Sequence, residues 1–175
     1  GKTLAGRLHE IYRWTGYSKE ELFDHVFTGP QGMQVIQAIM QDYREHPPAE
    51  VEGKKVVLVL DHLTQEAKTP DGIKLFGNEA RGYQTTPEGL RVYGFRHADG
   101  EQFAQENFLI FLLEDGSKFA VRPSGTEPKI KYYVLARGRY EDREKRETYD
   151  EVDAYVRRVG IWLGNHAEGV AGRME

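Results

Sequence analysis

Hydrophobic residues recur at helical spacing in three tracts of the chain, near residues 3–15, 32–46 and 141–163. Side chains three and four positions apart share one face of a helix, so each tract predicts an amphipathic helix. The three apolar stripes are Leu4, Leu8, Ile11 and Tyr12; Ile36, Ile39, Met40 and Tyr43; and Tyr149, Val152, Val156, Val159 and Leu163. Gly16 is a typical helix stop, and Pro47-Pro48 ends the second helix because a residue before proline is pushed out of the α region.

Short apolar runs rich in β-branched and aromatic residues predict the strands. KKVVLVLDHL (54–63) is typical of a buried strand, and LRVYGF (90–95) of a shorter one. NFLIFLL (107–113) and KFAV (118–121) flank Asp115-Gly116, which favours a tight hairpin. In the last run, 129–136, the residues Ile130, Tyr132, Val134 and Ala136 alternate with more polar ones, so one face should be buried.

Three segments are less certain. In 18–28, Ser18 and Glu21 resemble a helix capping box, whereas LFDHVF suits a strand equally well. Residues 64–89 are rich in glycine, proline, threonine and charge, and predict a long excursion from the sheet. After residue 163, the sequence GNHAEGVAGRME predicts a frayed tail.

The order of these elements favours an α+β fold. A hairpin joins antiparallel strands, and two long amphipathic helices can cover one face of a sheet. We therefore expect an antiparallel sheet over about residues 29–163 with helices packed on one face, a layer fold like that of the TATA-box-binding protein, and not a doubly wound parallel sheet.

Composition narrows the function classes. The 175 residues are 39% hydrophobic and 30% charged, with no apolar run approaching a membrane span and no pattern of a signal peptide. The absence of cysteine excludes disulfides and thiolate metal sites and suits a cytoplasmic protein. A net charge of −4 argues against nucleic-acid binding. The six histidines show no metal-ligand spacing, and Asp61 and His62, adjacent on a strand, should point to opposite faces.

Basic residues nevertheless concentrate in 118–145, where eight of them outnumber four acidic ones. Within this tract the loop RPSGTEPKIK (122–131) gathers groups that bind anions. Arg122 offers a planar fork, Ser124 and Thr126 offer hydroxyls, Gly125 allows a positive φ and close backbone approach, and Lys129 adds a point charge. Pro123 and Pro128 would restrict the loop, and Glu127 would orient Arg122 or a lysine, or accept a sugar hydroxyl. The alternative is an ordinary hairpin turn with solvated charges.

RPSGTEPKIKYY resembles the phosphate-binding signature in the C-terminal domain of the α-D-phosphohexomutases, the phosphoglucomutase and phosphomannomutase enzymes. The hairpin EDGS and the strand FAVRPSG before it agree with that family. The opening resembles the end of the family's third domain, and GMQVIQAIM the first helix of its fourth. The resemblance implies that residues 1–28 are the tail of the third domain and that residues 29–175 form the C-terminal phosphate-binding domain.

The resemblance also implies a mechanism. In the family, a phosphoserine in the first domain exchanges phosphoryl groups between C1 and C6 of a hexose phosphate through a bisphosphate intermediate. A Mg²⁺ held by three aspartates in the second domain assists, and the third domain contacts the sugar. The fourth domain holds the phosphate that is not being transferred. This role would fall here to Arg122, Ser124, Gly125, Thr126 and Lys129.

The chain also departs from the family's full set of motifs. It contains no Ser-His-Asn stretch, no Asp-x-Asp pair and no Gly-Glu-Glu sugar loop. We therefore expect a C-terminal fragment that binds no Mg²⁺, is inactive alone, and has a sugar phosphate and the other domains of its polypeptide as partners. The alternatives are a stand-alone anion-binding or regulatory interaction module, or a phosphopentomutase or sugar-bisphosphate synthase of the same family.

Overall fold

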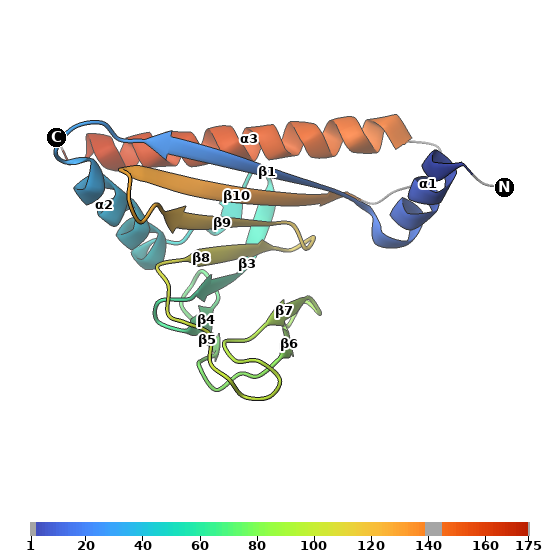
Figure 1. Cartoon of the computed structure of the whole chain (residues 1–175), viewed down its shortest axis with the longest axis horizontal. Coiled ribbons are helices and arrows are strands. Elements are labelled where there is room, and N and C mark those ends of the chain that lie inside the picture. Colours follow the sequence, from blue (N-terminus) through green and yellow to red (C-terminus); the bar gives the residue numbers. More distant parts are fainter. Residues whose placement is uncertain (1–2, 139–144, 175) are drawn as a thin grey trace.

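The computed structural model describes residues 3–138 and 145–174. Within these residues, three helices and ten strands follow one another (Figure 1). Their bounds are α1 Leu4–Thr15, β1 Tyr17–Val26, α2 Gly32–Glu45, β2 Glu50–Val51, β3 Lys54–Asp61, β4 Glu66–Lys68, β5 Lys74–Phe76, β6 Tyr83–Thr85, β7 Arg91–Tyr93, β8 Leu109–Leu113, β9 Lys118–Pro123, β10 Lys129–Gly138 and α3 Lys145–Gly172.

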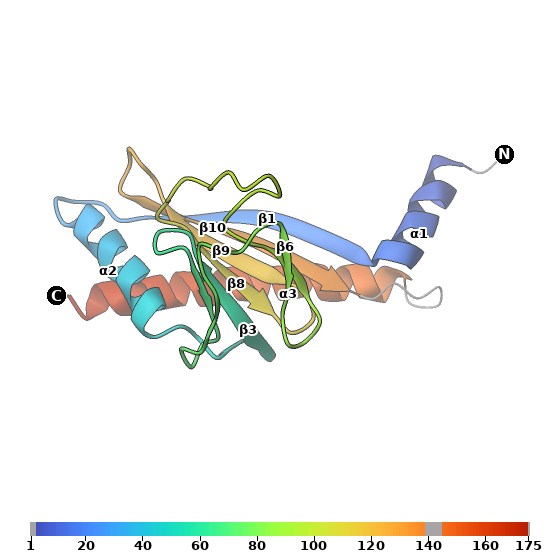
Figure 2. The ribbon, with the colours of Figure 1, turned by 90° about the horizontal axis from the view of Figure 1, so that it is seen from below.

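Seven strands form one continuous sheet in the order β1-β10-β9-β8-β3-β4-β5, and β2 pairs with β3 beside this path. Each of these neighbouring pairs is antiparallel. Helices α2 and α3 lie on one side of the sheet, as the two perpendicular views show (Figures 1 and 2). The predicted α+β fold, with an antiparallel sheet and helices on one face, is therefore confirmed.

The main hydrophobic core lies between the sheet and these two helices. The alternation predicted for the last strand is confirmed, because Ile130, Tyr132, Val134 and Ala136 are all buried on this side. At its centre Phe119 is fully buried and stacks on Phe111, with ring centroids 4.5 Å apart. The two rings belong to adjacent strands, β9 and β8, and pair directly across them. They join the sheet to the apolar stripes of both helices.

The ambiguous segment 18–28 lies mostly in β1, which pairs with β10 along its whole length from Tyr17 to Val26. Its alternate residues face α3. The ring of Phe23 lies so close to Gly160 that a Cβ there would come within 2.5 Å of it, and His25 pairs with Glu168 at 2.8 Å. The strand thus shares a sheet and a core with the elements after residue 29.

Helix α3 continues to Gly172, so the frayed tail predicted after residue 163 is wrong. The apolar stripe of α3 continues at helical spacing beyond Leu163 through Ala167 and Val170, which are both buried. Gly164 and Gly169 lower the helix propensity of this last stretch, but its burial in the main core stabilises the helix.

Residues 77–108, named here the covering segment, fold over part of the opposite face of the sheet (Figure 1). That face, named the open face, carries the side chains of Lys118, Ala120 and Arg122 from β9. Val92 and Phe95 of the covering segment are buried against Leu58, Leu60 and Leu112 of the sheet, forming a second apolar cluster. The long excursion predicted from residue 64 is therefore partly sheet, through β4 and β5, and partly a cover with its own small core.

A histidine at the α2–α3 contact should make stability depend on pH. His166 stacks on Tyr43 with ring centroids 4.2 Å apart, and its Nε2 lies 2.9 Å from Asp42 Oδ2. Burial lowers the pKa of His166, although Asp42 opposes this. Below a pH of about 6.5 the unfolded state therefore binds more protons than the folded state, so the free energy of unfolding must decrease as the pH decreases.

We expect the free energy of unfolding to decrease from about pH 7 to about pH 5, and to decrease less steeply in His166→Gln. Urea titrations at several pH values would measure both slopes. His97→Gln is the matched control, because His97 is exposed. Parallel pH curves for the protein and its His166→Gln variant would contradict this account.

Candidate phosphate-binding loop

The candidate loop joins β9 to β10 at the end of the sheet near α2 (Figure 1). The Ser124 N–H donates to the Lys129 carbonyl at 2.8 Å, and the Lys129 N–H donates to the Glu127 carbonyl at 2.7 Å. The connection between β1 and α2, residues 27–31, and the start of α2 contact the loop at Pro128. The Phe27 N–H donates to the Pro128 carbonyl at 2.9 Å, and a Cβ at Gly32 would lie 3.0 Å from Pro128 Cβ. The base of the loop is therefore fixed to the framework.

Arg122 projects from β9 on the open face. Its side chain is 52% exposed, and its nearest charged partner is Glu106, with Nη2 and Oε2 3.5 Å apart. An ion pair this long and exposed contributes little to stability. The guanidinium is therefore held loosely at the entrance of the loop and can exchange this partner for another anion. Sequence reasoning missed Glu106, which belongs to the covering segment and carries no local signal.

The tip of the loop presents groups that the described part of the protein leaves unused. The hydroxyls of Ser124 and Thr126 form no hydrogen bond within residues 3–138 and 145–174, and Thr126 is exposed. The positive φ considered for Gly125 is not observed, and a Cβ placed there would meet nothing within 4 Å. Neither the backbone conformation nor packing against the described residues requires glycine at this position.

Lys129 differs from the other candidates because two carboxylates hold its ammonium group. Its Nζ lies 3.0 Å from Glu127 and 3.6 Å from Asp24 on β1. The hydrogen bond that Lys129 donates to the Glu127 carboxylate raises the pKa of Lys129, so the ammonium stays charged. Glu127 therefore orients a lysine, which was one of the roles considered for it. The structure brings Arg122, Ser124, Gly125 and Thr126 to one exposed edge, with Lys129 partly neutralised beside them.

The other candidate pair, Asp61 and His62, is separated as predicted. Asp61 is buried on the helix side, where Arg44 Nε donates to its Oδ2 at 2.8 Å. His62 lines a cavity on the open face, and burial lowers its pKa. Arg44 also reaches Asn107 Oδ1 at 2.6 Å, so Asp61 belongs to a structural ion pair between α2 and the sheet.

Within the described residues, no group of three or more histidine, aspartate or glutamate side chains is placed to hold a metal ion. None of the helices in that part of the chain is both long enough and apolar enough to cross a membrane.

Comparison with known proteins places the loop in a family. The sequence model for the phosphoglucomutase/phosphomannomutase C-terminal domain matches residues 36–154, about two thirds of the chain and all of the loop. The phosphoglucomutase of Staphylococcus aureus strain USA300 is 36% identical over 138 residues, covering 77% of this chain and 20% of that protein. The phosphoglucomutase of the bovine strain RF122 is 34% identical over 134 residues, with the same coverage.

A solved structure of parafusin, a phosphoglucomutase of Paramecium in its open form, covers 95% of this chain at 13% identity with a TM-score of 0.46. The chain spans about one fifth of the length of the curated relatives it matches. Because the family model matches about two thirds of the chain, the chain belongs to the phosphoglucomutase/phosphomannomutase C-terminal domain family.

Proposed function

We propose that this chain is the substrate-phosphate-binding part of a phosphosugar mutase, and that residues 122–129 hold the phosphate that is not being transferred. The enzyme would move a phosphoryl group between C1 and C6 of a hexose phosphate through a bisphosphate intermediate, with Mg²⁺ bound by other domains of the same cytoplasmic polypeptide. A domain that begins near Gly16 would keep β1 with its sheet and leave α1 as the tail of the preceding domain.

The observation that carries the proposal is the unused binding capacity at the loop tip. Two hydroxyls without partners in the described protein, one half-exposed guanidinium and one glycine that nothing in the chain requires lie together on a fixed base. A phosphate would accept hydrogen bonds from these donors, and the missing Cβ at Gly125 would let its oxygens approach the backbone.

The residues would have graded roles. Arg122 would supply the bidentate, permanently charged contact, while Ser124 and Thr126 would each donate one hydrogen bond. Lys129 would contribute mainly through its long-range potential, because Glu127 and Asp24 already occupy its ammonium group. When a phosphate binds Arg122, Glu106 would lose its partner and the covering segment would be released at that point.

The residues proposed to bind here recognise only the phosphate, so the same loop would serve glucose, mannose and pentose phosphates. A phosphopentomutase or a sugar-bisphosphate synthase would use the same loop. A stand-alone anion-binding module is less favoured, because both phosphoglucomutases match this chain over only a fifth of their length.

Titration with inorganic phosphate, followed by backbone amide shifts in NMR spectra, tests the proposal on this chain. We expect the amide signals of residues 122–129 to shift and the shifts to saturate, and shifts confined to another region would overturn the assignment.

The chain itself should show no mutase turnover with Mg²⁺ and a sugar bisphosphate, because its sequence lacks the family's serine and aspartate motifs.

Gly125→Ala should separate binding from stability. A Cβ at residue 125 meets nothing within 4 Å, so the free energy of unfolding should change by less than about 0.5 kcal/mol. Phosphate affinity should nevertheless fall about tenfold, the cost of one hydrogen bond to a charged group. Gly29→Ala is the contrasting control, since Gly29 also has an open Cβ position but a φ of 97°. It should lower stability and leave phosphate binding unchanged.

A further inference from the structure

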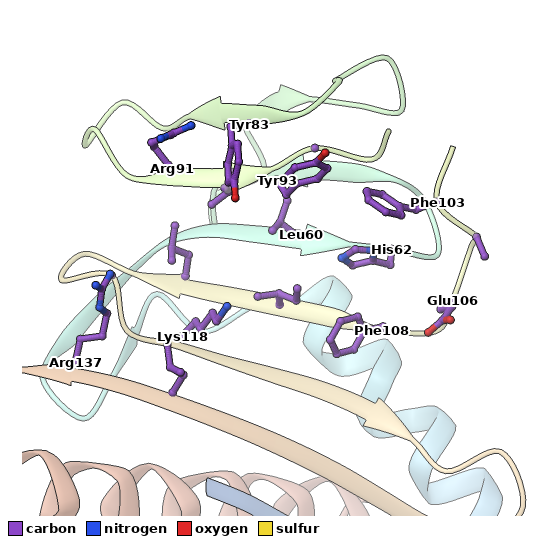
Figure 3. Close-up of a pocket in the computed structure, with 17 residues that line it drawn as sticks. Leu60, His62, Tyr83, Arg91, Tyr93, Phe103, Glu106, Phe108, Lys118 and Arg137 are labelled. Carbon is purple, nitrogen blue, oxygen red and sulfur yellow. The ribbon is translucent and has the colours of Figure 1, made fainter. Parts of the chain in front are cut away.

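A second feature of the open face lies apart from the phosphate loop. A cavity of about 770 Å³ separates the β6–β7 hairpin from the sheet (Figure 3). This volume falls in the range of small-molecule binding sites. The lining comes from β3, β7, β8, β9, β10 and the covering segment, but includes no residue of the loop tip 123–129.

Charge is segregated along this cavity. Arg91, Lys118 and Arg137 lie toward one end and Glu106 toward the other (Figure 3). Glu106 is the only acidic residue in the lining, and it already pairs with Arg122. Like charges brought together repel one another, so an anion at this end would be stabilised by all three cations.

The three cations retain binding capacity. Lys118 forms no ion pair or hydrogen bond through its side chain within the described residues, and Arg91 contacts only the ring of Tyr83, 4.4 Å from its centroid. Arg137 donates through Nη2 to the Thr15 carbonyl at 3.3 Å, which leaves its other donors available. Lys118 pairs across the sheet with Leu135, so Arg137, two residues on, is its diagonal neighbour on the same face.

Aromatic rings form much of the remaining lining. Tyr93 and Phe103 belong to the covering segment, with ring centroids 5.7 Å apart, and Phe108 approaches from the side of the sheet (Figure 3). His62 lies between these walls, and burial lowers its pKa, which favours the neutral imidazole. A flat ring can stack on such side chains without a specific pattern of hydrogen bonds.

We propose that this cavity binds a phosphorylated molecule with a flat aromatic ring, such as a nucleotide, with its phosphates against Arg91, Lys118 and Arg137 and its ring among Tyr93, Phe103 and Phe108. The site is distinct from the loop at 122–129. Lys118 is four residues from Arg122 and six from Ser124 along an extended strand, about 13 Å and 20 Å, so one phosphate group cannot contact both Lys118 and the loop.

Binding at this site would also bear on the loop. Glu106 lies in the lining of the cavity and pairs with Arg122, so a ligand that changes the position of Glu106 changes the availability of that guanidinium. The cavity is thereby placed to act as a regulatory site. A nucleotide bound in it would change how readily Arg122 binds a phosphate at the loop. Binding of a nucleotide in the cavity does not depend on the function proposed for the loop, whereas the regulatory effect rests on that function.

Calorimetric titration of the 175-residue chain with ADP tests the proposal. We expect saturable binding that weakens as salt rises, and an affinity about tenfold lower in Lys118→Glu. Lys55→Glu is the matched control, because Lys55 is an exposed lysine on β3 outside the cavity and should leave ADP affinity unchanged. Lys118 has no partner in the described structure, so its replacement should not unfold the protein.

Two further measurements separate the parts of the site. Tyr93→Leu should weaken ADP about tenfold and leave the affinity for inorganic phosphate unchanged, as expected for loss of ring stacking. The double variant Ser124→Ala, Thr126→Ala should leave ADP binding intact. The proposal is overturned if millimolar ADP does not saturate, if Lys118→Glu binds as the unmodified chain does, or if the loop variant abolishes ADP binding.

Discussion

Replacing Arg122 with alanine should weaken binding of the sugar phosphate by roughly ten- to a hundredfold in an enzyme that carries this chain together with the family's other domains. The expectation follows from the position of the guanidinium, which is half-exposed at the loop and has only a 3.5 Å contact to Glu106. Loss of hydrogen bonds to a charged group costs about 1.5–3 kcal/mol. Arg122→Lys should recover part of the affinity, because lysine keeps the charge but not the planar fork.

Steady-state kinetics with glucose 1-phosphate, across a range of substrate concentrations, would measure this loss. Arg158→Ala is a matched control, since Arg158 is 53% exposed and pairs with Glu52 at 3.2 Å on the helix side of the sheet. It removes an arginine of similar exposure and pairing far from the loop. Equal kinetic losses in both variants would show that the effect is one of net charge rather than of the loop.

Phe119→Ala should be the most destabilising of the substitutions considered, with a loss of about 3–5 kcal/mol in the free energy of unfolding. The side chain is fully buried, stacks on Phe111 at 4.5 Å and meets the edge of Trp162 at 6.2 Å. Truncation would leave a cavity between β8, β9 and α3. A loss of this size is a large fraction of the ~5–15 kcal/mol that stabilises an ordinary domain.

Denaturant titration followed by tryptophan fluorescence is suited to this measurement, because Trp162 lies against the deleted ring. Trp14→Ala is the aromatic control. Its side chain is 89% exposed on α1, so its removal should change stability by less than about 0.5 kcal/mol. If Phe119→Ala costs no more than this control, the main core is not centred where the structure places it.

Much of the fold could be predicted where the sequence repeats a simple period. Ile130, Tyr132, Val134 and Ala136 alternate strictly, and Asp115-Gly116 fixes the hairpin before them. Prediction failed where local signals were balanced. In β1 both faces carry apolar residues, with Phe23 against α3 and Leu22 more than half exposed, so periodicity gave no decision between strand and helix. Only the pairing with β10 settles it.

The candidate site shows the same division. Arg122, Ser124, Gly125 and Thr126 adjoin one another in sequence, so their proximity needed no knowledge of the fold. Glu106 and Asp24, which pair with Arg122 and Lys129, come from distant segments and could not be identified. The conformation of Gly125 could not be predicted either. Glycine tolerates both signs of φ, and φ of Gly125 is not positive in the structure.

The pairing of β1 with β10 has a consequence for the order in which the protein folds. Tyr17 faces Gly138 across the sheet, so this edge closes a loop of more than a hundred residues. Pairings so distant in sequence are slow to form, because the entropy of loop closure must be overcome before any contact compensates for it. The β8–β9–β10 meander can form through local turns before β1 pairs with β10. During synthesis on a ribosome, β1 would emerge first and be incorporated among the last, leaving the exposed Leu22 and Val26 in an unpaired strand throughout that interval.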